Sequence, residues 1–106
     1  MNRGSLRCPI PEDMREELAA DPYMYRCIVG TSLCSGKIEW NHAFTYAGKR
    51  QNERWALIPM CGYHHYHEAE YREEIRDAMR ERINHFGAHI EAAQKYHKSD
   101  LFRQLV

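Results

Sequence analysis

Residues that could bind metal ions are concentrated between positions 27 and 67 of this 106-residue chain. Three of the four cysteines and four of the seven histidines fall in this segment. Thiolate and imidazole groups are the side chains that zinc prefers in structural sites. The composition of the segment therefore predicts metal binding before any fold is considered.

Four of these residues match a closed tetrahedral zinc site of the three-cysteine, one-histidine type: Cys27, Cys34, Cys61 and His64. Two residues separate Cys61 from His64, a spacing at which a tight turn brings two ligands to one ion. Six residues separate Cys27 from Cys34, which is wider than the usual spacing. A small domain has a limited core, so we expect zinc binding to contribute directly to folding.

Two other interpretations of the cysteines are open. They could be inert core residues, or all four could form two disulfides in an oxidising compartment. The chain lacks the apolar N-terminal stretch of a secretory signal and any apolar run near the ~20 residues of a membrane span. We therefore expect a cytoplasmic protein with reduced thiols, in which Cys8, outside the cluster, is free.

A second set of residues, His42, Asn52 and His65, is interleaved with the zinc ligands. A histidine with a pKa near neutrality can act as a general base towards water, and a divalent ion can stabilise a phosphate and its leaving oxygen. Taken singly, each residue has a simpler explanation as a packed histidine, a loop asparagine or a surface histidine. Their order, and their registry with the Cys61–His64 pair, favour a catalytic site.

This arrangement resembles the HNH endonuclease family, whose catalytic unit is a ββα-metal motif of two strands and a helix around one divalent ion. The resemblance covers residues 27–67 and rests on 39–42, on Asn52 and on the run 57–65. In size and style the chain is similar to small members found in phages. The resemblance implies a hydrolase that cleaves DNA and leaves 5′-phosphate and 3′-hydroxyl ends.

The resemblance also implies a role for each site residue. His42 is the general base, Asn52 braces the loop and orients the base, and His65 is the helix-borne ligand of a catalytic Mg²⁺ or Mn²⁺ ion. Asn41 stands where the family often has an acidic or histidine ligand, and its carbonyl oxygen can coordinate. His67 is a second candidate ligand, and which of the neighbouring His64, His65 and His67 binds which ion is open.

The net charge of the chain is zero, but its distribution is uneven. Residues 22–67 carry a net charge of +3, and Lys49, Arg50 and Arg54 fall in the loop between the expected strands. These three side chains could contact DNA phosphates, although a solvated charged loop explains them equally well. The alternative to an enzyme is a catalytically inactive, zinc-stabilised nucleic-acid-binding or adaptor module.

The sequence predicts a single domain over residues 1–106, with a core motif at 27–67 and a helical extension at 68–106. We expect an N-terminal helix near 12–20, strands near 37–40 and 55–60, a polar loop at 47–52 and a helix from Gly62. Apolar residues at four- and three-residue steps from Tyr71 to Phe86 predict one helical stripe, with Gly87 as its C-terminal cap and a further helix near 88–98. The predicted fold class is therefore α+β: a small zinc-stapled ββα-metal core with an N-terminal helix and a C-terminal helical extension. The oligomeric state is open.

Overall fold

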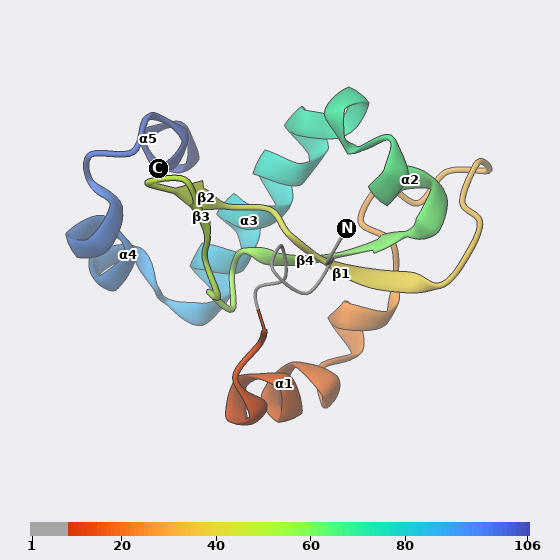
Figure 1. Cartoon of the computed structure of the whole chain (residues 1–106), viewed down its shortest axis with the longest axis horizontal. Helices are drawn as coiled ribbons and strands as arrows, with labels where there is room; N and C mark the ends of the chain where they lie inside the picture. The colour runs from red at the N-terminus through yellow and green to blue at the C-terminus, as the bar shows by residue number, and fades with distance from the viewer. Residues whose placement is uncertain (1–8) are drawn as a thin grey trace, which may run out of the picture.

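A two-stranded antiparallel sheet runs through the middle of the computed structural model, which describes residues 9–106 (Figure 1). Strand β1 (Ile38–His42) pairs with β4 (Leu57–Cys61), so that Ile38 lies opposite Cys61 and His42 lies opposite Leu57. All five residues of β4 are buried, which explains the continuous apolar run in its sequence. Helix α2 (Gly62–Tyr66) follows β4 directly. The protein is thus of mixed α+β class, with a strand, strand, helix order at its centre.

The junction between β4 and α2 is held by local hydrogen bonds. The Sγ atom of Cys61 accepts a hydrogen bond from the backbone N–H of His64 and so caps the helix. The Tyr63 N–H donates to the Ser35 carbonyl oxygen at 3.1 Å, which brings the loop before β1 onto the start of α2. Gly36 has a φ of 83°, and a Cβ atom there would lie 3.3 Å from the Gly62 Cα atom. Glycine at position 36 therefore permits this close approach.

The segment predicted as a polar loop contains a small hairpin. Strands β2 (Thr45–Tyr46) and β3 (Lys49–Arg50) pair through a two-residue turn at Ala47 and Gly48. Both turn residues have positive φ, 54° and 78°, as in the turns that match the twist of a hairpin. The Tyr46 ring contacts the Tyr96 ring with 5.1 Å between centroids, so the hairpin is anchored to the C-terminal helices.

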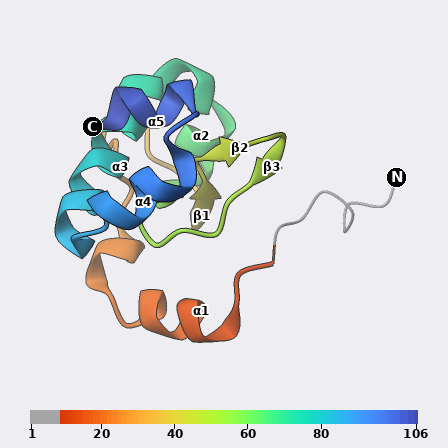
Figure 2. The same cartoon turned by 90° about the vertical axis from the view of Figure 1, so that its left-hand side faces the viewer.

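Helical elements occupy both ends of the chain. Their bounds are α1 (Glu12–Ala19), η2 (Pro22–Tyr25), η3 (Glu68–Tyr71), α3 (Arg72–Phe86), α4 (His89–Tyr96) and α5 (Asp100–Leu105), where η marks a 3₁₀ turn. Gly87 caps α3 with a φ of 61°, which confirms the predicted helix end. Helix α1 lies at the far end of the molecule from α2 and α5 (Figures 1 and 2). None of the helices within residues 9–106 has the length and apolar character needed to cross a membrane.

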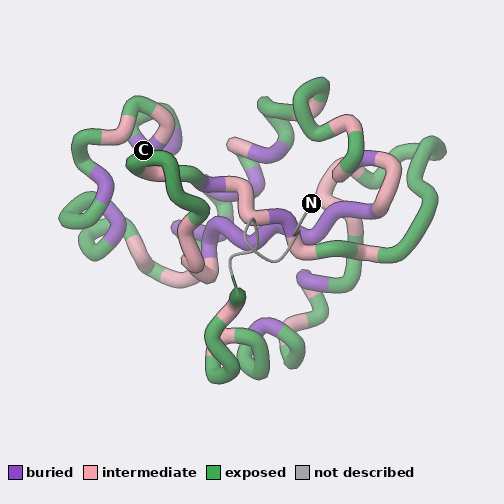
Figure 3. Tube along the Cα trace, viewed as in Figure 1, coloured by how far each residue is buried: buried purple, intermediate pink, exposed green. Residues whose placement is uncertain are grey.

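The C-terminal extension packs on the sheet of its own chain. Ile75, Met79 and Ile83 of the α3 stripe are buried in one cluster with β4 and the last two helices. The other main members of this cluster are Phe44, Trp55, Ile58, Met60, Ala92, Tyr96, Phe102 and Leu105. Buried residues continue along β4, whereas the loop over residues 30–37 is exposed (Figure 3).

A buried arginine joins the N-terminal part of the chain to α3. The Arg82 side chain is 4% exposed, and its Nη2 atom lies 2.6 Å from Oδ2 of Asp21. Its guanidinium also lies 3.9 Å from the centre of the Tyr23 ring and 4.6 Å from that of Phe86. The hydrogen bond from Arg82 holds the pKa of Asp21 below its ordinary value.

Cys8 lies outside the described residues.

Candidate metal centre and neighbouring cavity

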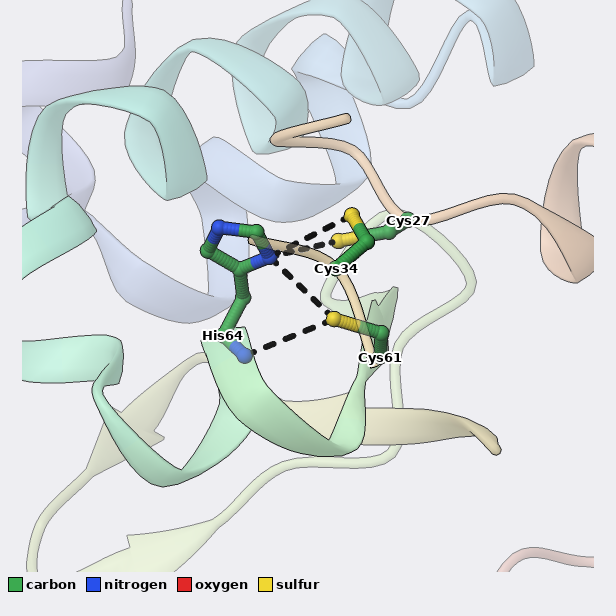
Figure 4. Close-up of side chains that lie close together, drawn as sticks. All are labelled: Cys27, Cys34, Cys61 and His64. Atoms are coloured by element: carbon green, nitrogen blue, oxygen red, sulfur yellow. Dashed lines mark hydrogen bonds between the residues drawn. The ribbon is translucent and has the colours of Figure 1, made fainter. Parts of the chain in front are cut away.

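Cys27, Cys34, Cys61 and His64 form one cluster whose ligand atoms all lie within 4.8 Å of one another. The Nδ1 atom of His64 lies 3.5 Å from the sulfurs of Cys27 and Cys34 and 3.2 Å from that of Cys61 (Figure 4). Zinc bonds of about 2.0–2.3 Å in a tetrahedron separate the ligand atoms by roughly 3.3–3.8 Å. The four residues are thus close enough to bind a metal ion, and their donor set and spacing are compatible with structural zinc.

The elements around the cluster explain how distant residues meet. Cys27 follows η2, Cys34 lies in the loop before β1, Cys61 ends β4 and His64 lies on α2. The Oγ1 atom of Thr31 lies 3.1 Å from Nε2 of His64, so it holds the ring with Nδ1 towards the sulfurs. Thr31 could not be recognised from the sequence, because its contact with His64 depends on how the loop folds back.

The thiols of the cluster differ in their acidity. Burial raises the pKa of Cys61, but hydrogen bonds from the backbone of His64 and Ser35 outweigh it and lower that pKa to about 6. Desolvation and the neighbouring thiols of Cys61 and Cys27 raise the pKa of Cys34. Since metal ligands must be deprotonated, Cys61 is the thiol best prepared to receive the ion.

Beside this cluster, a cavity of about 640 Å³ lies between β1, the hairpin and α3. Asn41, His42 and His65 all line it, so three of the predicted catalytic and metal-binding residues share one cavity. The remaining lining residues include three arginines and an apolar group: Arg50, Arg72 and Arg76, with Trp40, Ala43, Ile75, Met79 and Leu101.

Asn52 fixes the orientation of His42. Its Oδ1 atom lies 2.9 Å from Nε2 of His42, and its Nδ2 atom donates to the carbonyl oxygen of Pro9 at 2.7 Å. The second contact requires an amide donor, so the oxygen of Asn52 must face the histidine. An amide oxygen only accepts, so Nε2 of His42 carries the proton and Nδ1 is the basic nitrogen.

His65 and Asn41 each have a carboxylate partner that the sequence did not reveal. The Nδ1 atom of His65 lies 2.5 Å from Oε1 of Glu39, which leaves Nε2 of the ring as the basic nitrogen. Asn41 is buried, and its Nδ2 atom donates to Oε2 of Glu68 at 2.8 Å and to Sδ of Met60 at 3.6 Å. These contacts engage the amide nitrogen of Asn41, so its carbonyl oxygen is the atom available for a cation.

Other predicted residues lie apart from this cavity lining. His67 pairs with Glu70, with 2.9 Å between Nδ1 and Oε2. Arg54 pairs with Glu17 at 2.5 Å and lines a different cavity. Lys49 is exposed on β3. The geometry therefore brings Asn41, His42, Arg50 and His65 together and leaves Lys49, Arg54 and His67 outside the group.

In the part of the chain that the structure describes, the three-cysteine, one-histidine cluster is the one grouping of at least three His, Cys, Asp or Glu ligand atoms close enough for a metal ion. A divalent ion beside His42 would thus rely on the amide oxygen of Asn41 and on His65, with water and phosphate oxygens completing its shell.

No protein-family model, curated protein or solved structure matches the chain.

Proposed function

We propose that the protein is a metal-dependent endonuclease of the HNH type, which hydrolyses DNA phosphodiester bonds. The observation that carries this proposal is that His42, oriented by Asn52, and His65 line one cavity. An oriented imidazole beside a candidate cation ligand is a combination suited to phosphodiester hydrolysis.

In the proposed reaction, Nδ1 of His42 accepts a proton from a water molecule, and the water oxygen attacks phosphorus. The bond between phosphorus and the 3′ oxygen then breaks, and the departing oxygen takes a proton from solvent, which leaves 5′-phosphate and 3′-hydroxyl ends. The hydrogen bond between His42 Nε2 and Asn52 keeps the ring in the basic tautomer and stabilises the imidazolium that forms. In this role Asn52 is a positioning residue.

The residues of the cavity fit a Mg²⁺ or Mn²⁺ ion. Asn41 Oδ1 and His65 Nε2 would hold it, and Glu39 orients His65 in the way that carboxylates orient metal-binding histidines elsewhere. When bound, such an ion stabilises charge on the phosphate and on the leaving oxygen. The zinc proposed for the cysteine cluster would be structural, and it would fix α2 through His64, next to His65.

Cleavage of supercoiled plasmid DNA in the presence of Mg²⁺ or Mn²⁺ tests the proposal. We expect nicked or linear products from the wild-type protein and a loss of about 100-fold or more in rate for His42→Ala. The exposed His97 offers a matched control, because His97→Ala removes an imidazole that is not part of this lining. Equal cleavage by folded His42→Ala and His97→Ala proteins would contradict the proposal.

The second candidate function is a zinc-stabilised nucleic-acid-binding or adaptor module without catalysis. It is favoured by Asn41, since a neutral amide binds Mg²⁺ more weakly than a carboxylate does. Metal analysis separates the two functions. One tightly bound zinc per chain, with no Mn²⁺ binding and no metal-stimulated cleavage, supports the module, whereas metal-stimulated cleavage supports the enzyme.

A further inference from the structure

One face of α3 lines the same cavity as His42 and His65. The residues on this face are Arg72, Ile75, Arg76 and Met79. Their spacing, i, i+3, i+4 and i+7, places them on one side of the helix over its first two turns. The C-terminal extension thus contributes a wall to the cavity as well as packing on the sheet.

Within the described residues, neither Arg72 nor Arg76 of this wall forms an ion pair with a carboxylate that would neutralise its charge. Nη1 of Arg76 donates to Oε1 of Gln104 at 3.0 Å, and this acceptor is neutral. Within residues 9–106, no carboxylate oxygen lies within 4.0 Å of the side-chain nitrogens of Arg72 or Arg76. Arg80, on the same helix but outside the lining, instead pairs with Asp77 at 2.7 Å.

Two guanidinium groups one helical turn apart suit an anionic polymer. Residues at i and i+4 of a helix have Cβ atoms about 5–6 Å apart, and arginine binds phosphate through two parallel hydrogen bonds. Ile75 and Met79, which also line the cavity, are buried, and the cavity volume of about 640 Å³ is of ligand size. Glu68 also lines the cavity, and its carboxylate accepts a hydrogen bond from the amide of Asn41.

We propose that Arg72 and Arg76 form a phosphate-binding subsite for the DNA backbone next to the scissile bond. This inference rests on the proposed function for the identity of the polymer and for the position of the scissile phosphate. The subsite makes α3 the helix that positions the substrate, while β1 and α2 carry the reacting groups. Its residues lie outside the motif that pointed to nuclease chemistry.

The test is DNA binding by zinc-loaded protein without added Mg²⁺ or Mn²⁺, measured as fluorescence anisotropy of a short labelled duplex over a range of NaCl concentrations. The variant is Arg72→Gln combined with Arg76→Gln. Each lost phosphate contact lowers the slope of log affinity against log salt by about 0.9, so the double variant should lose about 1.8. We also expect its affinity to fall about 10-fold or more at low salt.

Arg80→Gln is the control, because it removes one arginine charge from the same helix outside the cavity lining. We expect it to bind DNA like the wild type, and circular dichroism checks that all variants are folded. If the folded double variant has the affinity and slope of Arg80→Gln, or if the wild type binds no DNA, the subsite is refuted. If the wild type cleaves no plasmid but the double variant binds DNA more weakly than the wild type, the phosphate-binding subsite is supported and the nuclease proposal is refuted. If the wild type cleaves plasmid but the double variant binds DNA normally, the nuclease proposal is supported and the subsite is refuted.

Discussion

Removal of the proposed zinc ion is expected to destabilise the protein strongly and to disturb the cavity beside it. The segment at 26–37 contains no helix or strand. Apart from Cys27 and Cys34, it is tied down by few contacts, such as the hydrogen bonds from Ile28 to the Pro59 carbonyl and from Tyr63 to the Ser35 carbonyl, each 3.1 Å long. Without an ion, three sulfurs and one imidazole lose their common partner, so this segment and α2 should loosen together.

The size of the effect can be estimated from general values. An ion present at about 1,000 times its dissociation constant stabilises the folded state by about 4 kcal/mol, and structural zinc usually binds more tightly than that. For a domain of about 100 residues, 1 kcal/mol corresponds to a change of roughly 4–8 °C in melting temperature. We therefore expect chelation to lower the melting temperature by at least about 15 °C.

Zinc content and thermal unfolding, measured on the same samples, provide the assay. The wild type should contain one zinc per chain, and Cys34→Ser should contain little and melt early. Cys34 is exposed, so serine at this position removes a ligand without leaving a cavity in the core. Cys8→Ser is the control, since we expect Cys8 to be a free thiol. The reasoning fails if fully reduced wild-type protein carries no zinc and melts at the same temperature with and without a chelator.

Three further predictions follow from the hydrogen-bond partners. Asn52→Ala should lower the cleavage rate at least about 10-fold. Asn52→Asp should move the pH–rate profile to higher pH, because a carboxylate raises the pKa of the adjacent histidine. Unchanged pH–rate profiles would contradict this prediction. Glu68→Ala should weaken Mn²⁺ binding, measured by calorimetry, about 10- to 100-fold, while Glu68→Gln keeps an acceptor for the amide of Asn41 and should bind nearly normally. Equal affinity of the two variants would refute that role. Arg82→Met should destabilise the protein by about 2–3 kcal/mol in urea unfolding, since it leaves Asp21 without its partner. The folded pKa of Asp21 is lowered, so this stabilisation is present above its unfolded pKa and is lost as pH falls through the folded pKa. The wild type should therefore lose stability more steeply than Arg82→Met below about pH 4, and parallel curves would argue against it.

The cysteine–histidine cluster and the central element order were predictable because part of their signal is local. Cys61 and His64 are two ligands at one turn, and the apolar run of β4 ends where α2 begins. The hairpin at 45–50 was missed, because two-residue strands carry no periodicity and alanine rarely takes a positive φ. The helix expected from Gly62 is interrupted after Tyr66 and divided into α2, η3 and α3. No Pro or Gly lies at this interruption, so it could not be predicted from the sequence.

The partners of the site residues could not be predicted, because they depend on tertiary contacts. Glu39 lies 26 residues from His65, and Glu68 lies 27 residues from Asn41. No spacing rule connects such pairs. The stripe of Arg72 and Arg76 was visible in principle, since the arginines stand at positions i and i+4 of a predicted helix. Only the folded chain reveals that this face borders the cavity of His42.

His64 and His65 are consecutive residues of α2, one in the thiol-rich cluster and the other in the wall of the neighbouring cavity. Consecutive Cα atoms are about 3.8 Å apart, so a displacement of the backbone at His64 also displaces the backbone at His65. Oxidation of the exposed sulfur of Cys34 would thus be expected to disturb the neighbouring cavity through α2, without modifying any residue that lines that cavity.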